Sequence, residues 1–326
     1  MRGKVPVADR GPSSGPGAAQ NLSQAKLLYG PFAPLLPNGK YFDFTSSGIK
    51  YDFGYQTSGY EMPYNAAQFT LIYNNALVPS PPTSMIDLAI WIQSNPGKFA
   101  YPVPSDANFE SSVLLRHFFG AFCAPYLDFM GTFNEALYTA RTPALWAKLN
   151  QLQPYMWRNA TTFKTQPPAN IAALDALFAS GQVAFTFTYD PLKAAAMVAA
   201  GTWNASTTRS YVFTSGNLQG TIGNINFVAI PSNAPNVAGA LVVANALASP
   251  AQMFARAHPE VWGTVPAFAP LRMDDGWNAA FGEIAAFKSA NTPDMSTLAQ
   301  HALAELDAAY APRLEADWAT YVNATV

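Results

Sequence analysis

The sequence predicts an α/β fold, and three consecutive features carry that prediction. Residues 170–180 (NIAALDALFAS) place apolar side chains at helical spacing, and Gly181 follows where a helix would end. Residues 183–189 then alternate between large apolar and small or polar side chains, as a strand does. Asp190 and a following proline open another apolar helix, which Gly201 ends. A strand between two helices is typical of an α/β layer, for which we expect a mostly parallel sheet.

One strand and three helices are predicted before this unit. The strand ends at a proline-rich stretch, which cannot continue a sheet. Thr83 is placed to cap the first helix, and Pro143 is placed to open the third. The strand covers residues 69–73, and the helices cover residues 83–95, 111–122 and 142–153.

Two strands and several helices are predicted after the unit. The glycine-rich stretch 216–223 joins the two strands, and its spacing matches neither a phosphate loop nor a dinucleotide fingerprint. It is interpreted either as a flexible connection or as backbone that offers N–H groups to a ligand. The strands cover residues 210–214 and 226–230, and the helices cover residues 234–248, 250–257 and most of the chain from about residue 282.

The composition excludes several classes of protein. The 326 residues are 50% hydrophobic and 12% charged with a formal net charge of −2, so a large core is available and nucleic acid is not an expected partner. No apolar stretch is long enough to span a bilayer. Cys123 is the single cysteine and is interpreted as a core residue. Residues 1–20 are predicted to be disordered and lack the apolar segment of a signal peptide.

No motif for catalysis or metal binding stands out. The G-x-S-x-G frame of a serine nucleophile is absent. The three histidines are far apart in sequence, so we expect no metal, and no cofactor motif is present. Glu61, Asp106 and Asp190 are the carboxylates that could face a ligand. For Asp106 and Asp190 a role as turn or helix-cap residues is an equal alternative.

Aromatic side chains make up 13% of the chain, and several lie beside polar residues in predicted loops. Aromatic rings with a few carboxylates suit an organic cation, through cation–π attraction and charge pairing. A weaker case exists for an anion, with Arg116, Arg158 or Arg209 as its partner.

Several stretches of the sequence carry a family resemblance. They are GYEMPYNAAQFTLIYN (59–74), PPTSMIDLAIW (81–91), NPGKFAYPVPSD (95–106) and GNINFVAIPSNAPNVAGALVVANALASPAQ (223–252). In this order they resemble the periplasmic solute-binding proteins of bacterial ABC importers, in a branch near the thiamine, spermidine and iron binders. The resemblance extends over residues 27–285.

The resemblance implies a two-lobed α/β fold of the periplasmic-binding-protein type II, with a ligand cleft between the lobes. Lobe I is expected to combine residues 21–90 with 225–326, and lobe II to hold residues 95–215. The crossings between them are expected near residues 78–95 and 216–226. Family members carry further βα units before the first stretch. Lobe I is therefore expected to be truncated, with an open sheet edge.

The implied site lies between the lobes, and lobe closure is expected to bury a small polar or cationic solute. The expected partners are that solute and the membrane permease of an ABC importer, and the expected state is a monomer in the periplasm or outside the cell. The ligand-binding residues are expected to be Tyr60, Glu61, Tyr64, Asp106, Phe109, Ser111, Ser112, Trp157, Tyr189, Asp190 and Asn224.

The sequence departs from the family pattern at some of these positions, and two alternatives stay open. Tyr64 and Asn65 stand where the family has Trp-Gly, so the ligand is not identified. One alternative is an enzyme on a two-lobed scaffold, of carbohydrate-active or transferase type, with Asp190 or Glu61 moving a proton. The other is a remnant that binds nothing.

Overall fold

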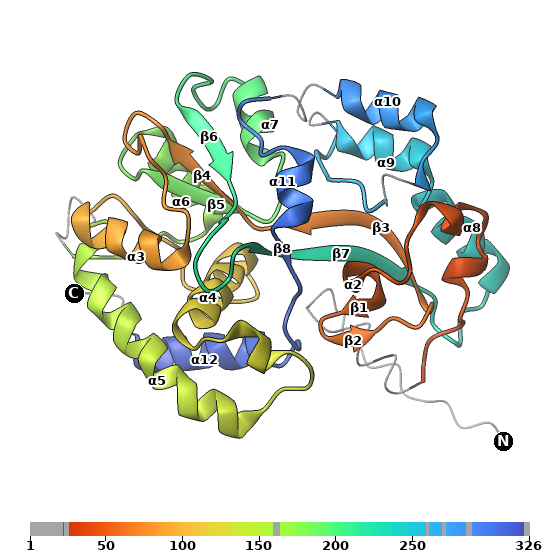
Figure 1. The fold of residues 1–326 in the computed structure, drawn as a ribbon, viewed down its shortest axis with the longest axis horizontal. Helices are drawn as coiled ribbons and strands as arrows, with labels where there is room; N and C mark the ends of the chain where they lie inside the picture. The colour runs from red at the N-terminus through yellow and green to blue at the C-terminus, as the bar shows by residue number, and fades with distance from the viewer. Residues whose placement is uncertain are drawn as a thin grey trace.

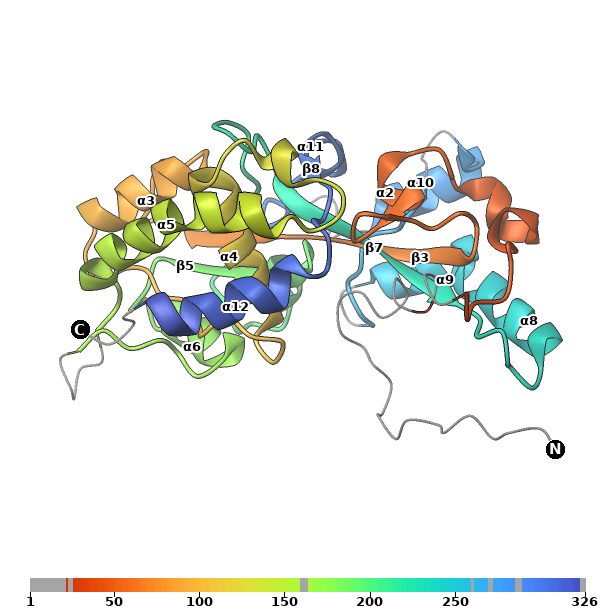
Figure 2. The same ribbon diagram turned by 90° about the horizontal axis from the view of Figure 1, so that it is seen from below.

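The computed structural model describes residue 22 and residues 26–158, 164–258, 261–268, 272–284 and 289–322. The segment predicted to be disordered, residues 1–20, lies outside these ranges. The described chain forms two lobes side by side (Figure 1). Long strands run through the centre from one lobe into the other (Figure 2).

Lobe I, residues 26–68 and 223–284, is built on the antiparallel pair of β3 and β7. The pair runs from Glu61 opposite Ala229 to Gln68 opposite Gly223, with an irregularity after Pro63. One hydrophobic cluster fills this lobe, and it includes Phe42 from the N-terminal segment. The elements are η1 (Ala33–Leu35), η2 (Pro37–Tyr41), α2 (Ser47–Lys50), β1 (Tyr51–Asp52), β2 (Tyr55–Gln56), β3 (Glu61–Gln68), β7 (Thr221–Ala229), α8 (Val237–Leu247), α9 (Pro250–Ala257) and α10 (Asp275–Glu283).

Lobe II, residues 69–222 and 302–322, holds the larger cluster, which includes aromatic rings from α4, α5, α6 and α12. The boundary with lobe I carries α11 (Met295–Gln300) and β8 (Ala302–Leu303). The elements of lobe II are β4 (Thr70–Asn74), α3 (Met85–Ser94), α4 (Phe109–Phe122), η3 (Tyr126–Phe129), α5 (Glu135–Leu152), η4 (Gln153–Tyr155), α6 (Ile171–Ala179), β5 (Phe185–Thr188), α7 (Lys193–Ala199), β6 (Thr208–Tyr211) and α12 (Tyr310–Tyr321).

The lobe II sheet corrects the prediction of mostly parallel pairing. Its strand order is β5-β4-β6, and β4 pairs antiparallel with both neighbours. The helix–strand unit does give β5 and β6 the same direction, as an α/β unit should. However, β4 enters directly from β3 of the other lobe, runs the opposite way and lies between them. Local periodicity cannot reveal a strand inserted from a distant part of the chain.

The lobe limits also differ from the predicted ones at both ends. Residues 69–90 lie in lobe II, because Phe69 and Met85 belong to its core cluster. The chain also returns to lobe II at its C-terminal end, where Leu314 and Trp318 of α12 pack in that same cluster. An amphipathic helix shows in its sequence which face is buried, but not which lobe buries it.

Several helix ends follow the sequence signals, and two do not. Gly181 follows α6 at φ +72°, as predicted, and Asn170, predicted as the first helical residue, is its N-cap. The cap of α3 is Ser84 rather than Thr83, with the Ser84 hydroxyl accepting from the N–H of residue 87. Helix α5 begins earlier than predicted, after the cap Asn134, and keeps Pro143 inside.

His117 fastens α4 to the strand that crosses between the lobes. Its Nδ1 donates to the Val113 carbonyl at 2.8 Å, and its Nε2 accepts the Ile222 N–H at 2.9 Å. The ring lies against Phe69, with 4.6 Å between ring centroids. Burial lowers the pKa of His117 to about 3, so the ring is neutral at physiological pH.

Among the described residues no single helix meets the length and apolarity of a membrane span. The pair α8–α9, bent by 54°, does so only when taken together.

Candidate functional site at the lobe boundary

Glu61 is a buried carboxylate at the first position of β3. Its side chain is 3% exposed, and its Oε2 atom has no hydrogen-bond partner among the described residues. Burial, and to a smaller extent the charge of Asp52, raises the pKa of Glu61 to about 8. A buried polar atom without a partner costs free energy, so this group requires either a proton or a partner that the chain does not supply.

Asp52, at the end of β1 in the β1–β2 hairpin, lies close enough to Glu61 for its charge to act on that carboxylate. The hairpin reverses through Phe53 and Gly54, both at positive φ (44° and 82°), as a tight two-residue hairpin turn requires. Burial raises the pKa of Asp52 to about 7, and Glu305 adds to the increase. Sequence analysis did not find Asp52, although the Phe-Gly turn beside it was a usable signal.

Arg116, Glu305 and Tyr189 form a buried polar group at the edge of lobe II. Arg116 of α4 pairs with Glu305, and both side chains are 2% exposed. The Tyr189 hydroxyl donates to the other carboxylate oxygen at 2.7 Å. Burial raises the pKa of Glu305, whereas the Arg116 guanidinium opposes that increase.

The first turns of α4 complete this side of the boundary. The Phe109 ring meets the Tyr189 ring edge-on, with centroids 5.2 Å apart. The Arg116 guanidinium lies 5.4 Å from the centre of the Phe109 ring. Ser111 is buried and its Oγ has no partner in the described chain, and the same holds for one terminal nitrogen of Arg116. Ser112 is also buried, and its carbonyl accepts from Arg116.

These charged groups are linked in a series across the boundary: Arg116 pairs with Glu305, the charge of Glu305 raises the pKa of Asp52, and the charge of Asp52 raises the pKa of Glu61. We call Asp52, Glu61, Arg116, Tyr189 and Glu305 the boundary cluster. When all its carboxylates are ionised, three negative charges face one guanidinium. Within the described residues no three side chains of His, Cys, Asp or Glu could hold a metal ion.

Contacts between the lobes lie next to this cluster. The Tyr55 hydroxyl of the β1–β2 hairpin donates to Asp307 at 3.1 Å. The same carboxylate accepts the Phe133 N–H of lobe II at 3.2 Å. The Asp307 backbone also packs against Gly54. The hairpin that carries Asp52 is thereby held against lobe II.

The structure gives other predicted site residues local roles. The Oδ1 atom of Asp190 accepts a hydrogen bond from the Leu192 N–H at 3.1 Å. This is the role as a turn residue that the sequence left open as an alternative to ligand binding. Burial raises the pKa of Asp190 to about 6. The Tyr64 ring lies 5.5 Å from the Arg256 guanidinium. Tyr60 directly precedes Glu61, and Asn224 of β7 lies opposite Ala67 in the strand pair.

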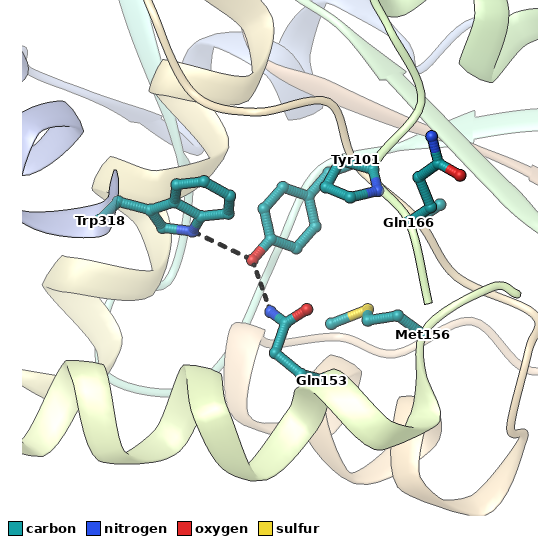
Figure 3. A pocket seen from close by; sticks show the side chains of 7 residues that line it. Tyr101, Gln153, Met156, Gln166 and Trp318 are labelled. Atoms are coloured by element: carbon teal, nitrogen blue, oxygen red, sulfur yellow. Dashed lines mark hydrogen bonds between the residues drawn. The ribbon is translucent and has the colours of Figure 1, made fainter. Parts of the chain in front are cut away.

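Two predicted site residues lie elsewhere. Asp106 is exposed in the loop before α4. Trp157 lines a surface groove that shares no residue with the boundary cluster. A second cavity, of about 10 Å³, lies inside lobe II where the Tyr101 hydroxyl accepts from Gln153 and Trp318 (Figure 3). That volume holds one water molecule and no solute.

Comparison with known proteins adds a family to this geometry. A model of the family "Bacterial extracellular solute-binding protein" matches residues 11–282. Protein YnjB of Escherichia coli strain K12 is 33% identical over 257 residues, which are 79% of this chain and 63% of that protein. The chain therefore spans less than two thirds of that relative's length.

Solved structures share the fold at low sequence identity. One is the spermidine/putrescine substrate-binding protein PotD of Streptococcus pneumoniae, with a TM-score of 0.57 and 14% identity over 92% of this chain and 80% of that one. Another is the maltose-maltodextrin binding protein of Alicyclobacillus acidocaldarius, with a TM-score of 0.59 and 15% identity over 93% and 78%. The likeness confirms the predicted two-lobed α/β class. Because the two names cover such different solutes, the fold alone identifies none.

Proposed function

Since this chain belongs to the family of bacterial extracellular solute-binding proteins, we propose that it captures a small polar or cationic solute between its lobes for an ABC importer. Membership of an extracellular family agrees with the periplasmic or extracellular location that the resemblance implied. It also favours the binding role over the enzyme alternative. The solute, the permease partner and lobe closure are parts of the proposal.

One observation carries the choice of a cation. Glu61 is buried without a partner for Oε2, and Asp52 lies close enough for its charge to raise the pKa of Glu61 further. Two carboxylates held in this way repel each other and lack a counter-charge. An ammonium or other cationic group placed between them would supply both the hydrogen bonds and the charge.

The surrounding residues suit the same kind of solute. Tyr60 directly precedes Glu61 in lobe I, and on the lobe II side the Phe109 ring meets the Tyr189 ring beside Arg116. Aromatic faces attract organic cations. Arg116 is already paired with Glu305, so it is not the free cation that an anionic solute would need.

Thermal unfolding against a panel of solutes tests the proposal. The panel contains spermidine, putrescine, thiamine, maltose, sulfate and single amino acids. A ligand present at about 100 times its dissociation constant stabilises a protein by about 2.7 kcal/mol, which raises the unfolding midpoint by several degrees. We expect a cationic member to produce this shift. A shift with maltose or sulfate alone would support the proposed solute-binding function but contradict the proposal that the solute is a cation. A cooperative melt that no panel member moves would count against both.

A further inference from the structure

A groove on the surface of lobe II lies apart from the boundary cluster and differs from it in its lining residues. Its volume is about 550 Å³, within the range of small-molecule sites. The side chains of Lys98, Trp157, Arg158 and Gln182 line it, together with two prolines and a glycine. None of these residues belongs to the boundary cluster.

Backbone hydrogen bonds fix the floor of this groove. The Gly97 N–H donates to the Tyr155 carbonyl, and the Trp157 N–H donates to the Phe99 carbonyl, both at 2.8 Å. On the other side the Ala184 N–H donates to the Lys98 carbonyl, also at 2.8 Å. Residues 97–99 are thereby held between residues 155–157 on one side and Ala184 on the other, so the lining side chains project from a fixed backbone.

Trp157 is the aromatic residue of the groove lining. Its ring packs against the core cluster of lobe II, and its indole N–H donates to the Gln182 amide oxygen at 3.3 Å. The ring is therefore fixed in position and has no further donor to offer. What remains available to a ligand is an aromatic surface.

The two cations of the groove lack an acidic partner. Lys98 lies 3.5 Å from the Gly181 carbonyl, and Arg158 donates to the Pro154 carbonyl at 3.3 Å, both long for such bonds. Within the described part of the chain neither forms an ion pair with a carboxylate, and the groove lining contains none. Most of the donors of both side chains are therefore unused.

We propose that this groove binds a small organic anion with a planar ring, whose carboxylate meets Lys98 and Arg158 and whose ring stacks on Trp157. A guanidinium can hold a carboxylate through two parallel hydrogen bonds, which are stronger than neutral ones. A cation would be repelled by both side chains. This proposal does not depend on the one made for the boundary cluster.

The test uses benzoate as the probe and the indole N–H resonance of Trp157 as the reporter. The resonance is assigned by its loss in Trp157→Phe. We expect benzoate to shift it to saturation, and benzamide, which is flat but uncharged, to leave it in place. The shift should weaken at higher ionic strength, because exposed charges are screened by salt.

Variants then separate this site from general surface binding. Lys98→Gln combined with Arg158→Gln should weaken benzoate binding at least about tenfold, the scale of a lost charge-assisted hydrogen bond. Lys148→Gln on α5, outside the groove, should leave it unchanged. The proposal is overturned if benzoate and benzamide act alike, if the double variant keeps its affinity, or if Lys148→Gln loses as much. Inorganic phosphate binding as tightly as benzoate would also overturn it, because the ring would then contribute nothing.

Discussion

Arg116 and Glu305 form a buried ion pair although 189 positions separate them in the chain. Arg116 lies on α4 of lobe II, and Glu305 lies on the segment that arrives from lobe I just before α12. The Tyr189 hydroxyl donates to the same carboxylate. The pair therefore fastens the C-terminal crossing to the lobe it enters, beside the proposed binding site.

Glu305→Ala is predicted to destabilise the protein by about 3–5 kcal/mol, because removing one partner leaves a buried guanidinium without its counter-charge. Urea unfolding of the purified variant measures this loss. The double variant Arg116→Met with Glu305→Met should lose less than Glu305→Ala alone, since no uncompensated charge remains. A double variant that is less stable than the single one would contradict this account.

Glu61→Gln is predicted to raise the free energy of unfolding at alkaline pH. The pKa of Glu61 is raised from 4.5 to about 8, so the folded state binds a proton that the unfolded state has released. Its contribution to stability is fully present below pH 4.5 and is lost as the pH rises through about 8, by up to about 1.4 kcal/mol per pH unit.

Denaturant unfolding at pH 4, 6.5 and 9 measures this effect. The gain from Glu61→Gln should grow from pH 4 to pH 9. Asp275→Asn, at an exposed position of α10, is the matched control and should show no alkaline gain. Equal effects of Glu61→Gln at all three pH values would show that the carboxylate is not held as described.

His117 is predicted to make the fold sensitive to acid. Its folded pKa is lowered from 6.5 to about 3, so its contribution to stability is present above pH 6.5 and is lost as the pH falls toward 3. Unfolding of the wild type and of His117→Gln at pH 7.5 and pH 4.5 checks this. The wild type should be the more stable at pH 7.5, and its advantage should shrink at pH 4.5. An advantage of constant size would refute the assignment.

Tyr55→Phe is predicted to weaken the binding of the solute that the thermal panel identifies and to lower the free energy of unfolding by no more than about 1 kcal/mol. The substitution removes the hydroxyl that joins the hairpin to Asp307, and a partly exposed hydrogen bond contributes about 1 kcal/mol, or about fivefold in affinity. Isothermal titration measures the affinity. Tyr51→Phe on the same hairpin, whose side chain is exposed, is the control and should bind as the wild type does.

The local elements were largely predictable because their signals are local. The helix predicted at residues 250–257 has the bounds observed for α9, where Ser249 caps the helix and Pro250 occupies its first turn. The cap Asn170 and the positive φ of Gly181 likewise follow from single residues. Glu61 was singled out as a candidate because carboxylates are few in this chain.

The partners of these residues could not be predicted in the same way. Nothing near Glu305 in sequence points to Arg116, and nothing near Tyr55 points to Asp307. Trp157 was grouped with the cleft by resemblance, but its neighbours in space are Lys98 and Gln182. Long-range contacts of this kind depend on where the chain passes from one lobe to the other, and periodicity and capping signals do not encode these crossings.

The return of α12 to lobe II has a consequence for the order in which the protein can fold during synthesis. Tyr310, Leu314 and Trp318 complete a core whose other members begin at Phe69. When the ribosome has synthesised α4 through β6, the helix α12 that completes this core has therefore not yet been made. Lobe II must wait, with part of its apolar surface uncovered, until lobe I has been synthesised and α12 has left the exit tunnel.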